Sequence, residues 1–191
     1  MEKRSQAKER LIFLRNFIRN PKEIGSITPS SQYLKKGMLK DVDFSKAKYI
    51  AEYGAGTGIF TKSILALARK DATLLCFETN RSFCAFLEKT IRDPRLIVIN
   101  DSAEHINTYL KVHHLPRIDY ILSSLPFSQL PERKKGRIMT ATKDALSPKG
   151  KFILYRYTFT FSDYLRSYFT SISKRFVALN IPPTFIYICQ K

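Results

Sequence analysis

The chain has 191 residues, 44% of them hydrophobic and 13% aromatic, which is enough to bury the core of one domain and excludes a generally disordered protein. Its three cysteines have no metal-ligand spacing and no apolar run approaches the ~18 residues of a membrane-spanning helix, so we expect no disulfide framework, no metal and a cytoplasmic protein. The 33 Lys and Arg residues against 16 Asp and Glu give a formal net charge of +17, which favours an anionic partner such as nucleic acid, an anionic membrane surface or an acidic substrate.

The N-terminal segment is basic and predicts two helices. Within residues 5–20, an apolar stripe at helical spacing is formed by Leu11, Leu14 and Ile18. Most Lys and Arg side chains of that segment fall off the stripe. Pro21 ends this helix, because the residue before a proline avoids the helical conformation. A second, short helix is predicted over residues 31–40.

From residue 48 onward, strands alternate with helices. The predicted strands are residues 49–53, 73–78, 96–99, 118–122 and 152–155. The predicted helices are residues 59–70, 81–91 and 132–146, and a turn is predicted over residues 148–150. This alternation indicates right-handed βαβ units and a mostly parallel sheet. Two late apolar runs, residues 176–179 and 185–189, flank Ile181-Pro182-Pro183 and predict a closing antiparallel hairpin.

A glycine-rich segment, Glu52-Tyr53-Gly54-Ala55-Gly56-Thr57-Gly58, connects the first of these strands to the helix that follows it. Glycines there let the backbone approach a ligand at the carboxyl edge of the sheet, where doubly wound folds bind ligands. The spacing lacks the third glycine position of the dinucleotide fingerprint and the Lys-Ser/Thr ending of a phosphate loop, and the acid at Glu52 disfavours a pyrophosphate. The segment therefore predicts a site for a cationic or hydroxyl-rich ligand; an ordinary glycine turn is the alternative.

Two further acids close the next two predicted strands. Glu78 stands at about the distance beyond the glycines at which an acid binds a ribose diol, although alone it would be interpreted as a solvated carboxylate at a strand end. Asp101, followed by Ser102 and Ala103, could accept a hydrogen bond from an exocyclic adenine amine. Asp101 or Ser102 could equally cap a helix, and the two roles are compatible.

These three segments together resemble the class I S-adenosylmethionine-dependent methyltransferases over roughly residues 48 to 155. The resemblance implies a Rossmann-like α/β fold, with a mostly parallel seven-stranded sheet, an antiparallel C-terminal hairpin and N-terminal helices, in a single domain over residues 1–191. It implies S-adenosylmethionine as the cofactor, bound by the core over residues 48–191. The methionine part would lie on the glycines with Glu52 near its ammonium group or a water network, Glu78 would bind the ribose, and Asp101 with Ala103 would hold the adenine. The cofactor-binding residues implied in this core are Glu52, Gly54, Ala55, Gly56, Gly58, Glu78, Asp101, Ser102 and Ala103.

After the fourth predicted strand comes Ser123-Ser124-Leu125-Pro126-Phe127, at the position where N-methyltransferases place a polar-x-Pro-aromatic motif. We expect this segment to form the catalytic site, because the carbonyl groups of a constrained turn can accept hydrogen bonds from an amine. Pro126 fixes the turn, and Phe127 offers a π face to a cationic sulfonium or ammonium group. The alternative is a turn that only ends the strand, with Phe127 in the core.

Further segments are similar to the bacterial phospholipid N-methyltransferases and extend the resemblance over almost the whole chain. They are residues 13–21, residues 25–31, Ser124-Leu125-Pro126-Phe127 with Leu130-Pro131, and Asn180-Ile181-Pro182-Pro183. The resemblance implies that residues 1–47 form basic amphipathic helices that cover the substrate and the cofactor, and that Thr28 and Ser30 also bind the cofactor. The sequence departs from the family at Ser124, where we expect glycine, and at Thr184, where alanine is more usual. These departures bear on the substrate more than on the methyl donor.

Three functions remain open at this point. The preferred one is methylation of the amine of a phosphatidylethanolamine-type phospholipid at an anionic membrane surface, where the N-terminal helix would lie as a peripheral anchor; the same helix could instead pack over the cofactor site. The second is ribosomal RNA adenine N6-methylation, with basic side chains on phosphates and aromatic rings on a flipped base. That family usually carries Asn where this chain has Ser124. The third, a catalytically silent module that binds nucleic acid or lipid, is disfavoured by the intact glycines, Glu78 and Asp101.

The lipid hypothesis also needs a base, because a lipid ammonium group with a pKa near the ~10 of a lysine must lose a proton before its nitrogen attacks the sulfonium methyl carbon. The sequence offers candidates without choosing among them: Tyr33, Tyr155, Tyr157, His105, His113 and His114. We expect the adjacent histidines to lie in a surface loop.

The charge is unevenly distributed along the chain. Residues 1–50 carry 12 basic and 5 acidic side chains, residues 51–129 carry 9 and 8, and residues 130–191 carry 12 and 3. The segments expected to meet the substrate are therefore strongly basic, whereas the cofactor-binding middle is almost neutral. This distribution predicts a docking face for an anionic partner.

Overall fold

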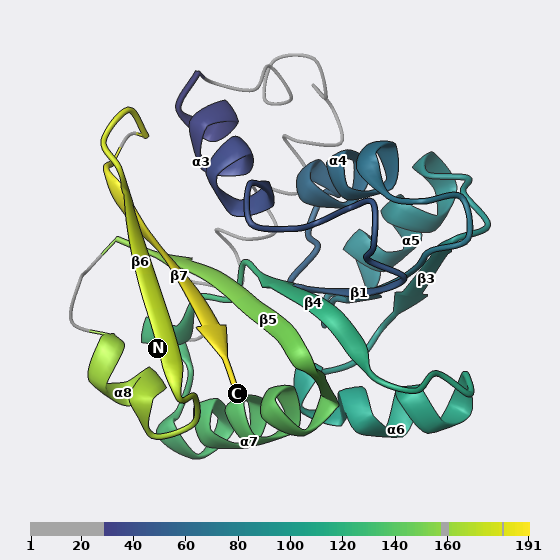
Figure 1. Ribbon diagram of the computed structural model, residues 1–191. Coiled ribbons are helices and arrows are strands. Elements are labelled where there is room, and N and C mark those ends of the chain that lie inside the picture. The colour runs from purple at the N-terminus through teal and green to yellow at the C-terminus, as the bar shows by residue number, and fades with distance from the viewer. Residues whose placement is uncertain (1–28, 158–160, 181) are drawn as a thin grey trace, which may run out of the picture.

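The computed structural model describes residues 29–157, 161–180 and 182–191, and within these residues the chain forms a seven-stranded sheet with helices on both faces (Figure 1). The strands are β1 (Tyr49–Tyr53), β2 (Thr73–Phe77), β3 (Leu96–Ile99), β4 (Ile118–Ser123), β5 (Leu146–Arg156), β6 (Ser171–Val177) and β7 (Thr184–Gln190). Their order in the sheet is β3-β2-β1-β4-β5-β7-β6. The first five are parallel, whereas β7 pairs antiparallel with β5 and with β6. The predicted fold class, with its C-terminal hairpin, is thus confirmed.

The helices cover the two faces of the sheet in sets that follow chain order. Figure 1 shows α3, α4 and α5 on one face and α6, α7 and α8 on the other. Their bounds are α3 (Pro29–Leu39), α4 (Ile59–Leu67), α5 (Arg81–Thr90), α6 (Ile106–Val112), α7 (Glu132–Ala145) and α8 (Ser162–Arg166), with 3₁₀ turns η1 (Ala103–His105) and η2 (Phe127–Gln129). Of the helices in the described ranges, none is both long enough and apolar enough to cross a membrane.

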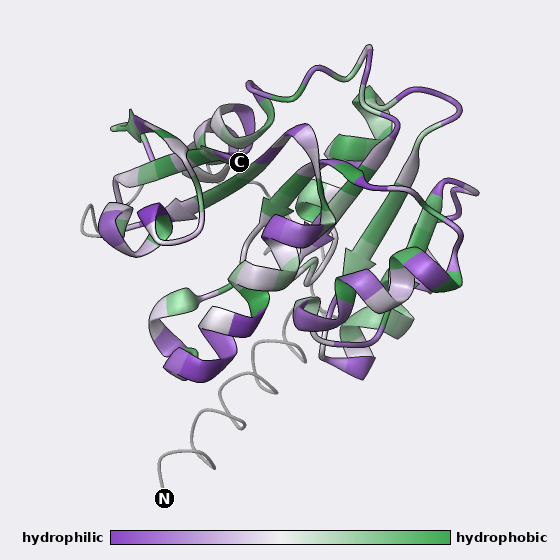
Figure 2. Cartoon of the chain, turned by 60° about the horizontal axis from the view of Figure 1, so that its bottom comes forward, coloured by the Kyte–Doolittle hydropathy of each residue, from purple (hydrophilic) through white to green (hydrophobic). Residues whose placement is uncertain are grey.

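The central strands are buried on both faces, so each contributes side chains to two hydrophobic cores. Along β1, Ile50 packs toward α3, α4 and α5, whereas Ala51 and Tyr53 pack toward α6 and α7. This alternation follows from the two-residue period of a strand. Figure 2 shows the result as a hydrophobic sheet between helices whose colouring alternates between hydrophilic and hydrophobic. The helices are therefore held by burial of their apolar stripes against the sheet.

Four parts of the chain differ from the expectations. The first strand of the closing hairpin, β6, covers Ser171–Val177 instead of residues 176–179, because most of its side chains are exposed and it contains no continuous apolar run. Strand β5 begins at Leu146 instead of residue 152, because residues 148–150 form a bulge inside the strand: Ile118 pairs with Leu146, but Tyr120 pairs with Lys151. Helices α6 and α8 were not predicted, since each has too few turns to show an apolar period. The predicted helix over residues 5–20 lies outside the described residues.

The strand order turns at β1, with β2 and β3 on one side and β4 and β5 on the other. In open α/β sheets, ligands bind outside the carboxyl ends of the strands at such a point. The segments that leave β1 and β4 meet there. Ser124 donates its N–H to the carbonyl of Tyr53 at 2.9 Å, and a Cβ on Gly54 would lie 3.2 Å from Cδ2 of Leu125. The glycine-rich segment and the Ser-Leu-Pro segment are thus neighbours.

Candidate functional site

A cavity of about 950 Å³ opens at the carboxyl ends of the first four parallel strands. It is bounded by the loops after β1, β2, β3 and β4, by α3 and by the end of β5. Its lining includes Leu34, Gly54, Ala55, Gly56, Thr57, Phe60, Glu78, Asn80, Phe83, Asp101, Ser102, Ala103, Ser124, Leu125, Pro126, Leu130, Lys134 and Tyr155. Most of the residues that the sequence singles out therefore converge on one cavity, although they come from four separate loops.

The three glycines of the loop after β1 have different surroundings. All three have positive φ angles, +74° at Gly54, +53° at Gly56 and +82° at Gly58, a conformation that side chains disfavour. Gly56 lines the cavity, and a Cβ built there meets no atom of the described residues within 4 Å. Gly58 does not line the cavity: a Cβ there would lie 2.6 Å from Cδ2 of Leu87 on α5. Gly58 thus serves helix packing, whereas Gly56 leaves the backbone open to a ligand.

Glu78 follows β2 and ties the glycine loop to the start of α5. Its Oε2 accepts the N–H of Gly56 at 2.9 Å, and its Oε1 accepts the N–H of Asn80 at 2.8 Å. Asn80 in turn caps α5 by accepting the N–H of Ser82 at 2.9 Å. The carboxylate is held by backbone groups and still borders the cavity, so it can present its remaining lone pairs to the hydroxyl groups of a ligand.

Asp101 follows β3 and is also held by the chain itself. Its Oδ1 accepts the N–H of Ser102 at 2.6 Å and lies 3.0 Å from Nδ1 of His105, while its Oδ2 accepts the hydroxyl of Tyr109 at 3.1 Å. Burial would raise the pKa of this carboxyl, but the hydrogen bonds with His105, Ser102 and Tyr109 together lower it. Ser102 and Ala103 are buried and line the cavity at the start of η1. This part of the lining is therefore anionic and rigidly positioned.

Glu52 lies within β1 beneath the glycine loop and does not line the cavity. It is 1% exposed, and its Oε2 accepts the hydroxyl of Thr61 at 2.7 Å and the thiol of Cys76 at 3.2 Å. Its Oε1 has no hydrogen-bond partner within the described ranges. Burial raises the pKa of Glu52 to about 7, and the hydrogen bonds from Thr61 and Cys76 oppose this shift only in part.

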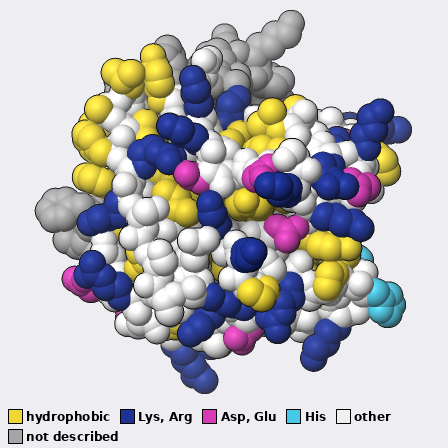
Figure 3. Space-filling model, in the orientation of Figure 1, with side chains coloured by type: hydrophobic (Ala, Val, Ile, Leu, Met, Phe, Trp, Pro, Cys, Tyr) yellow, Lys and Arg dark blue, Asp and Glu magenta, His cyan; other side chains and the backbone are white. Residues whose placement is uncertain are grey.

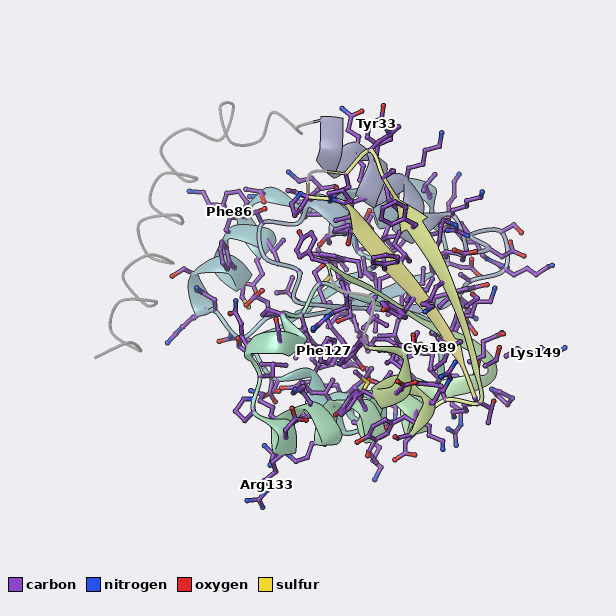
Figure 4. All side chains as sticks on the ribbon, turned by 90° about the vertical axis from the view of Figure 1, so that its left-hand side faces the viewer. Tyr33, Phe86, Phe127, Arg133, Lys149 and Cys189 are labelled. Carbon is purple, nitrogen blue, oxygen red and sulfur yellow. The ribbon has the colours of Figure 1, made fainter. Side chains whose placement is uncertain are left out.

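At the end of β4 and in the segment that follows it, some residues line the cavity and others lie in the core. Ser124, Leu125 and Pro126 line the cavity, whereas Ser123 is 1% exposed and Phe127 is fully buried. The Phe127 ring lies 5.7 Å from that of Phe161, and Figure 4 places it in the interior of the molecule. The expectation that Phe127 offers a π face to a cation is therefore not met in this structure, because its ring is used in packing.

The other expected residues are distributed as follows. Thr28 lies outside the described residues, and the side chain of Ser30, on α3, is not described either. His105 is bound to Asp101, and the ring of His113 stacks on Tyr109 at 6.4 Å, so neither reaches the cavity. Where the structure describes the chain, no group of His, Cys, Asp and Glu side chains is arranged to hold a metal ion.

Sequence reasoning missed several lining residues and left the role of Tyr155 open. Tyr155 ends β5, borders the cavity, and its hydroxyl is hydrogen-bonded to Ser124. Burial raises the pKa of Tyr155, with a smaller contribution from Tyr157, so the phenol is neutral near pH 7. Its place at the carboxyl end of a parallel strand is the signal that could have singled it out. Leu34, Phe83 and Lys134 carry no such signal, since they come from helix faces.

Three features fit S-adenosylmethionine. Gly56 leaves open space beside its backbone, the Glu78 carboxylate borders the cavity as a partner for a diol, and Asp101 lines it beside the apolar Ala103. The unpartnered Oε1 of Glu52 lies below the same loop and suits a water or an ammonium group. The anionic character of these groups matches a cationic ligand better than a phosphate.

Comparisons with known proteins also indicate a methyltransferase. Residues 6–144 match the family described as ribosomal RNA adenine dimethylase. The chain is 24% identical over 185 residues to an ornithine lipid N-methyltransferase of Singulisphaera acidiphila, with 96% of each chain covered. A solved structure of the N-methyltransferase NodS from Bradyrhizobium japonicum with S-adenosylhomocysteine has a TM-score of 0.70 at 11% identity, covering 87% of this chain and 89% of that one. The T. thermophilus 16S rRNA N2 G1207 methyltransferase has a TM-score of 0.63 at 16% identity, covering 86% of this chain but 43% of that one. These two likenesses show the fold.

Proposed function

Because this chain belongs to the ribosomal RNA adenine dimethylase family and is an S-adenosylmethionine-dependent methyltransferase, we propose that it methylates the primary amine of a membrane lipid of the phosphatidylethanolamine type. One observation carries the proposal of N-methyl transfer. The cofactor-compatible residues Gly56 and Glu78 line the same cavity as the turn Ser124-Leu125-Pro126. The same cavity can thus hold both a methyl donor and an amine.

The proposed cofactor contacts are those that border the cavity. Gly54, Ala55 and Gly56 hold the methionine part, Glu78 the ribose, and Asp101 with Ser102 and Ala103 the adenine. S-adenosylmethionine supplies an electrophilic methyl group on a sulfonium. Glu52 lies beneath the loop. Because its pKa is raised to about 7, a nearby ammonium group shifts it toward the charged form. Gly58 contributes by letting α5 approach the loop.

The acceptor amine is placed by the segment after β4. Pro126 restricts the turn, and the hydroxyl of Ser124 together with main-chain carbonyls of the turn accept hydrogen bonds from the amine. Tyr155, neutral near pH 7, holds the Ser124 hydroxyl in position and does not act as a base, so the lipid ammonium passes its proton to solvent water before the neutral nitrogen attacks the methyl carbon. We assign most of the acceleration to this positioning and to exclusion of water by the apolar lining of Leu34, Phe60 and Leu125.

Two observations favour a lipid acceptor. The ornithine lipid N-methyltransferase covers almost the whole chain, as expected if the two proteins act on related amines. The cavity lining is mostly apolar outside the acidic cofactor end.

The second candidate is an adenine in ribosomal RNA, and the family match over residues 6–144 favours it. An adenine N6 amine is neutral at pH 7 and needs only carbonyl acceptors, which the same turn can provide. The basic flanks of the chain would bind RNA phosphates. The acceptor must therefore be tested directly.

The test is incubation with S-adenosylmethionine labelled in its methyl group and one acceptor at a time: detergent-dispersed phosphatidylethanolamine, detergent-dispersed ornithine lipid, or ribosomal RNA. We expect label in lipid. Glu78→Ala should lose at least about tenfold in activity and in S-adenosylhomocysteine affinity, since two charge-assisted hydrogen bonds organise the loop. Glu88→Ala, an exposed acid on α5, is the matched control and should behave as the parent. Label in RNA but in neither lipid would contradict the proposal.

A further inference from the structure

The end of the β6–β7 hairpin exposes large apolar side chains. Phe176 is 55% exposed and Leu179 is 64% exposed, and Pro182 and Pro183 of the turn are exposed as well. Residues 176–185 contain no charged side chain. Figure 3 shows hydrophobic side chains gathered over this end of the hairpin, with Lys and Arg side chains beside them. Such a patch is typical of an interaction surface.

The hairpin end lies at the same edge of the sheet as the cavity. Strand β7 is antiparallel to β5, so Phe185 at its start pairs with Arg156 at the end of β5. Tyr157, which is 54% exposed, follows directly, and its ring lies 5.9 Å from that of Tyr155. Because Tyr155 lines the cavity, the end of the hairpin and the cavity mouth lie at the same edge of the sheet, with Phe176 on the face of Phe185 and Tyr155 on the opposite face with Ile186.

Helix α3 extends this surface from the other side. Tyr33 is 43% exposed, the next residue Leu34 lines the cavity, and Figure 4 places Tyr33 beside the end of the hairpin. The helix is fastened to β6, because Arg175 donates to both carboxylate oxygens of Asp41, at 2.7 and 2.9 Å. We call Tyr33, Tyr157, Phe176 and Leu179 together the apolar rim.

The charges next to the apolar rim have one sign. Lys35 and Lys36 on α3 and Lys174 on β6 flank it. Residues 29–40 and 171–191 contain no Asp or Glu, and Asp41 is already bound to Arg175. The rim thus combines apolar side chains with a cationic border, the combination that binds an anionic bilayer surface.

We propose that the apolar rim is the surface through which the protein docks on an anionic phospholipid bilayer. Phe176 and Leu179 enter the boundary between headgroups and acyl chains, and the flanking lysines contact lipid phosphates. This inference rests on the proposed function, because docking in this orientation puts the cavity mouth at the level of the headgroup amines. An RNA partner fits less well, since an uncharged hairpin end of Leu and Pro residues offers phosphates no counter-charge.

The test uses the absence of tryptophan from the chain. Phe176→Trp introduces a single tryptophan at the rim, and Val112→Trp introduces one at a 61% exposed position on α6 as the matched control, with emission excited selectively from tryptophan. Vesicles of phosphatidylglycerol and phosphatidylcholine, neither of which carries a primary amine, are added without S-adenosylmethionine. We expect a blue shift, and quenching by lipids brominated on the acyl chains, for Phe176→Trp but not for Val112→Trp. No shift at position 176, or equal shifts at both positions, would overturn the proposal.

A second variant measures the contribution of the rim to affinity. Phe176→Ser/Leu179→Ser should bind these vesicles about tenfold more weakly than the parent, because two large apolar side chains are lost from the bilayer contact. Leu67→Ser/Val112→Ser, with similarly exposed side chains on α4 and α6, should bind as the parent does. Equal affinity of the rim variant and the parent would overturn the proposal, as would an emission shift at position 176 that follows protein concentration without vesicles, which would indicate contact between two copies.

Methyl transfer to detergent-dispersed lipid separates this proposal from the proposed function. Phe176→Ser/Leu179→Ser should retain that activity, since docking is not required in detergent. If the parent docks on vesicles through the rim but labels no lipid in detergent, the docking surface stands and the lipid acceptor is wrong.

Discussion

Two carboxylates near the glycine loop have opposite electrostatic environments. Asp101 receives hydrogen bonds from Ser102, His105 and Tyr109, which lower its pKa despite partial burial. Among the described residues, Glu52 receives hydrogen bonds on one oxygen alone, from Thr61 and Cys76, and burial raises its pKa to about 7. Near neutral pH, Asp101 is charged, whereas Glu52 is close to half protonated. A residue of this kind makes folding depend on pH.

The sign of that dependence follows from the raised pKa of Glu52. The folded protein keeps the proton up to about pH 7, whereas the unfolded chain releases it near the ordinary value of 4.5. The stabilisation is therefore complete below about pH 4.5 and is lost as pH rises through about 7. Replacing Glu52 with Gln removes this loss. We expect the stability of Glu52→Gln relative to the parent to increase by about 2–3 kcal/mol between pH 5 and pH 8.

Urea unfolding of both proteins across this pH range measures the difference. Glu88→Gln, an exposed acid on α5, serves as the control and should follow the parent at each pH. Parallel stability profiles for Glu52→Gln and the parent would show that the carboxyl of Glu52 titrates normally.

At the scale of elements, two nearby glycines of the loop between β1 and α4 have different functions: one allows helix packing and the other borders the cavity. Gly58 starts α4 and allows Leu87 and Ile91 of the α5 region to approach within 2.6 and 3.0 Å of where a Cβ would lie. Gly56, two residues earlier, has no neighbour in that direction among the residues that the structure describes, and it borders the cavity. The two positions are therefore separable by mutation, although both have positive φ.

Gly58→Ala should lower the free energy of unfolding by about 2–4 kcal/mol, because backbone strain adds to overpacking against Leu87. Gly56→Ala should lose about 1 kcal/mol, from strain alone, while weakening S-adenosylhomocysteine binding. Urea unfolding and the ligand-induced shift in Tm measure the two effects. Equal losses of stability would mean that Leu87 moves aside at little cost.

Prediction of the elements from sequence succeeded where local pattern is sufficient. The central strands are continuous apolar runs next to glycines, so β1 and β2 lie within a residue of their predicted bounds. Helices α6 and α8 and the bulge in β5 were missed, because a helix of five or seven residues shows little periodicity and a bulge depends on the register with β4. Pairing between distant strands leaves no mark in a local window.

For the whole molecule, the residues that line the cavity and the residues that carry most of the positive charge come from different parts of the chain. The almost neutral stretch, residues 51–129, supplies the loops after the first four strands that form most of the cavity lining, whereas the basic flanks include α3 and the C-terminal hairpin. The net charge of +17 is thus a property of the surfaces around the cavity mouth and beyond it more than of the cofactor end. Electrostatic attraction to an anionic surface and cofactor binding should respond differently to salt.

Raising NaCl from about 0.05 to about 0.5 M should weaken binding to phosphatidylglycerol vesicles by about tenfold or more, since screening shortens the reach of exposed charges. The affinity for S-adenosylhomocysteine should change by less than about twofold over the same range, because its partners are partly buried and lie in the neutral region. Vesicles of phosphatidylcholine alone are the control for salt effects on the lipid. A similar salt dependence for both ligands would contradict this division.

The sequence by itself determined the alternation of strands and helices, the glycine loop and the acids at the ends of β2 and β3, since these depend on residues close together in the chain. Only the tertiary structure decided which side chains face the cavity. The Phe127 ring packs in the core against Phe161. Gly58 lies against Leu87 and not against the cavity. Tyr155 and the end of the hairpin are brought to the cavity mouth by the pairing of β5 with β7. Such contacts join segments that are far apart in the sequence, so the side chains that face the cavity are decided by packing of the complete fold.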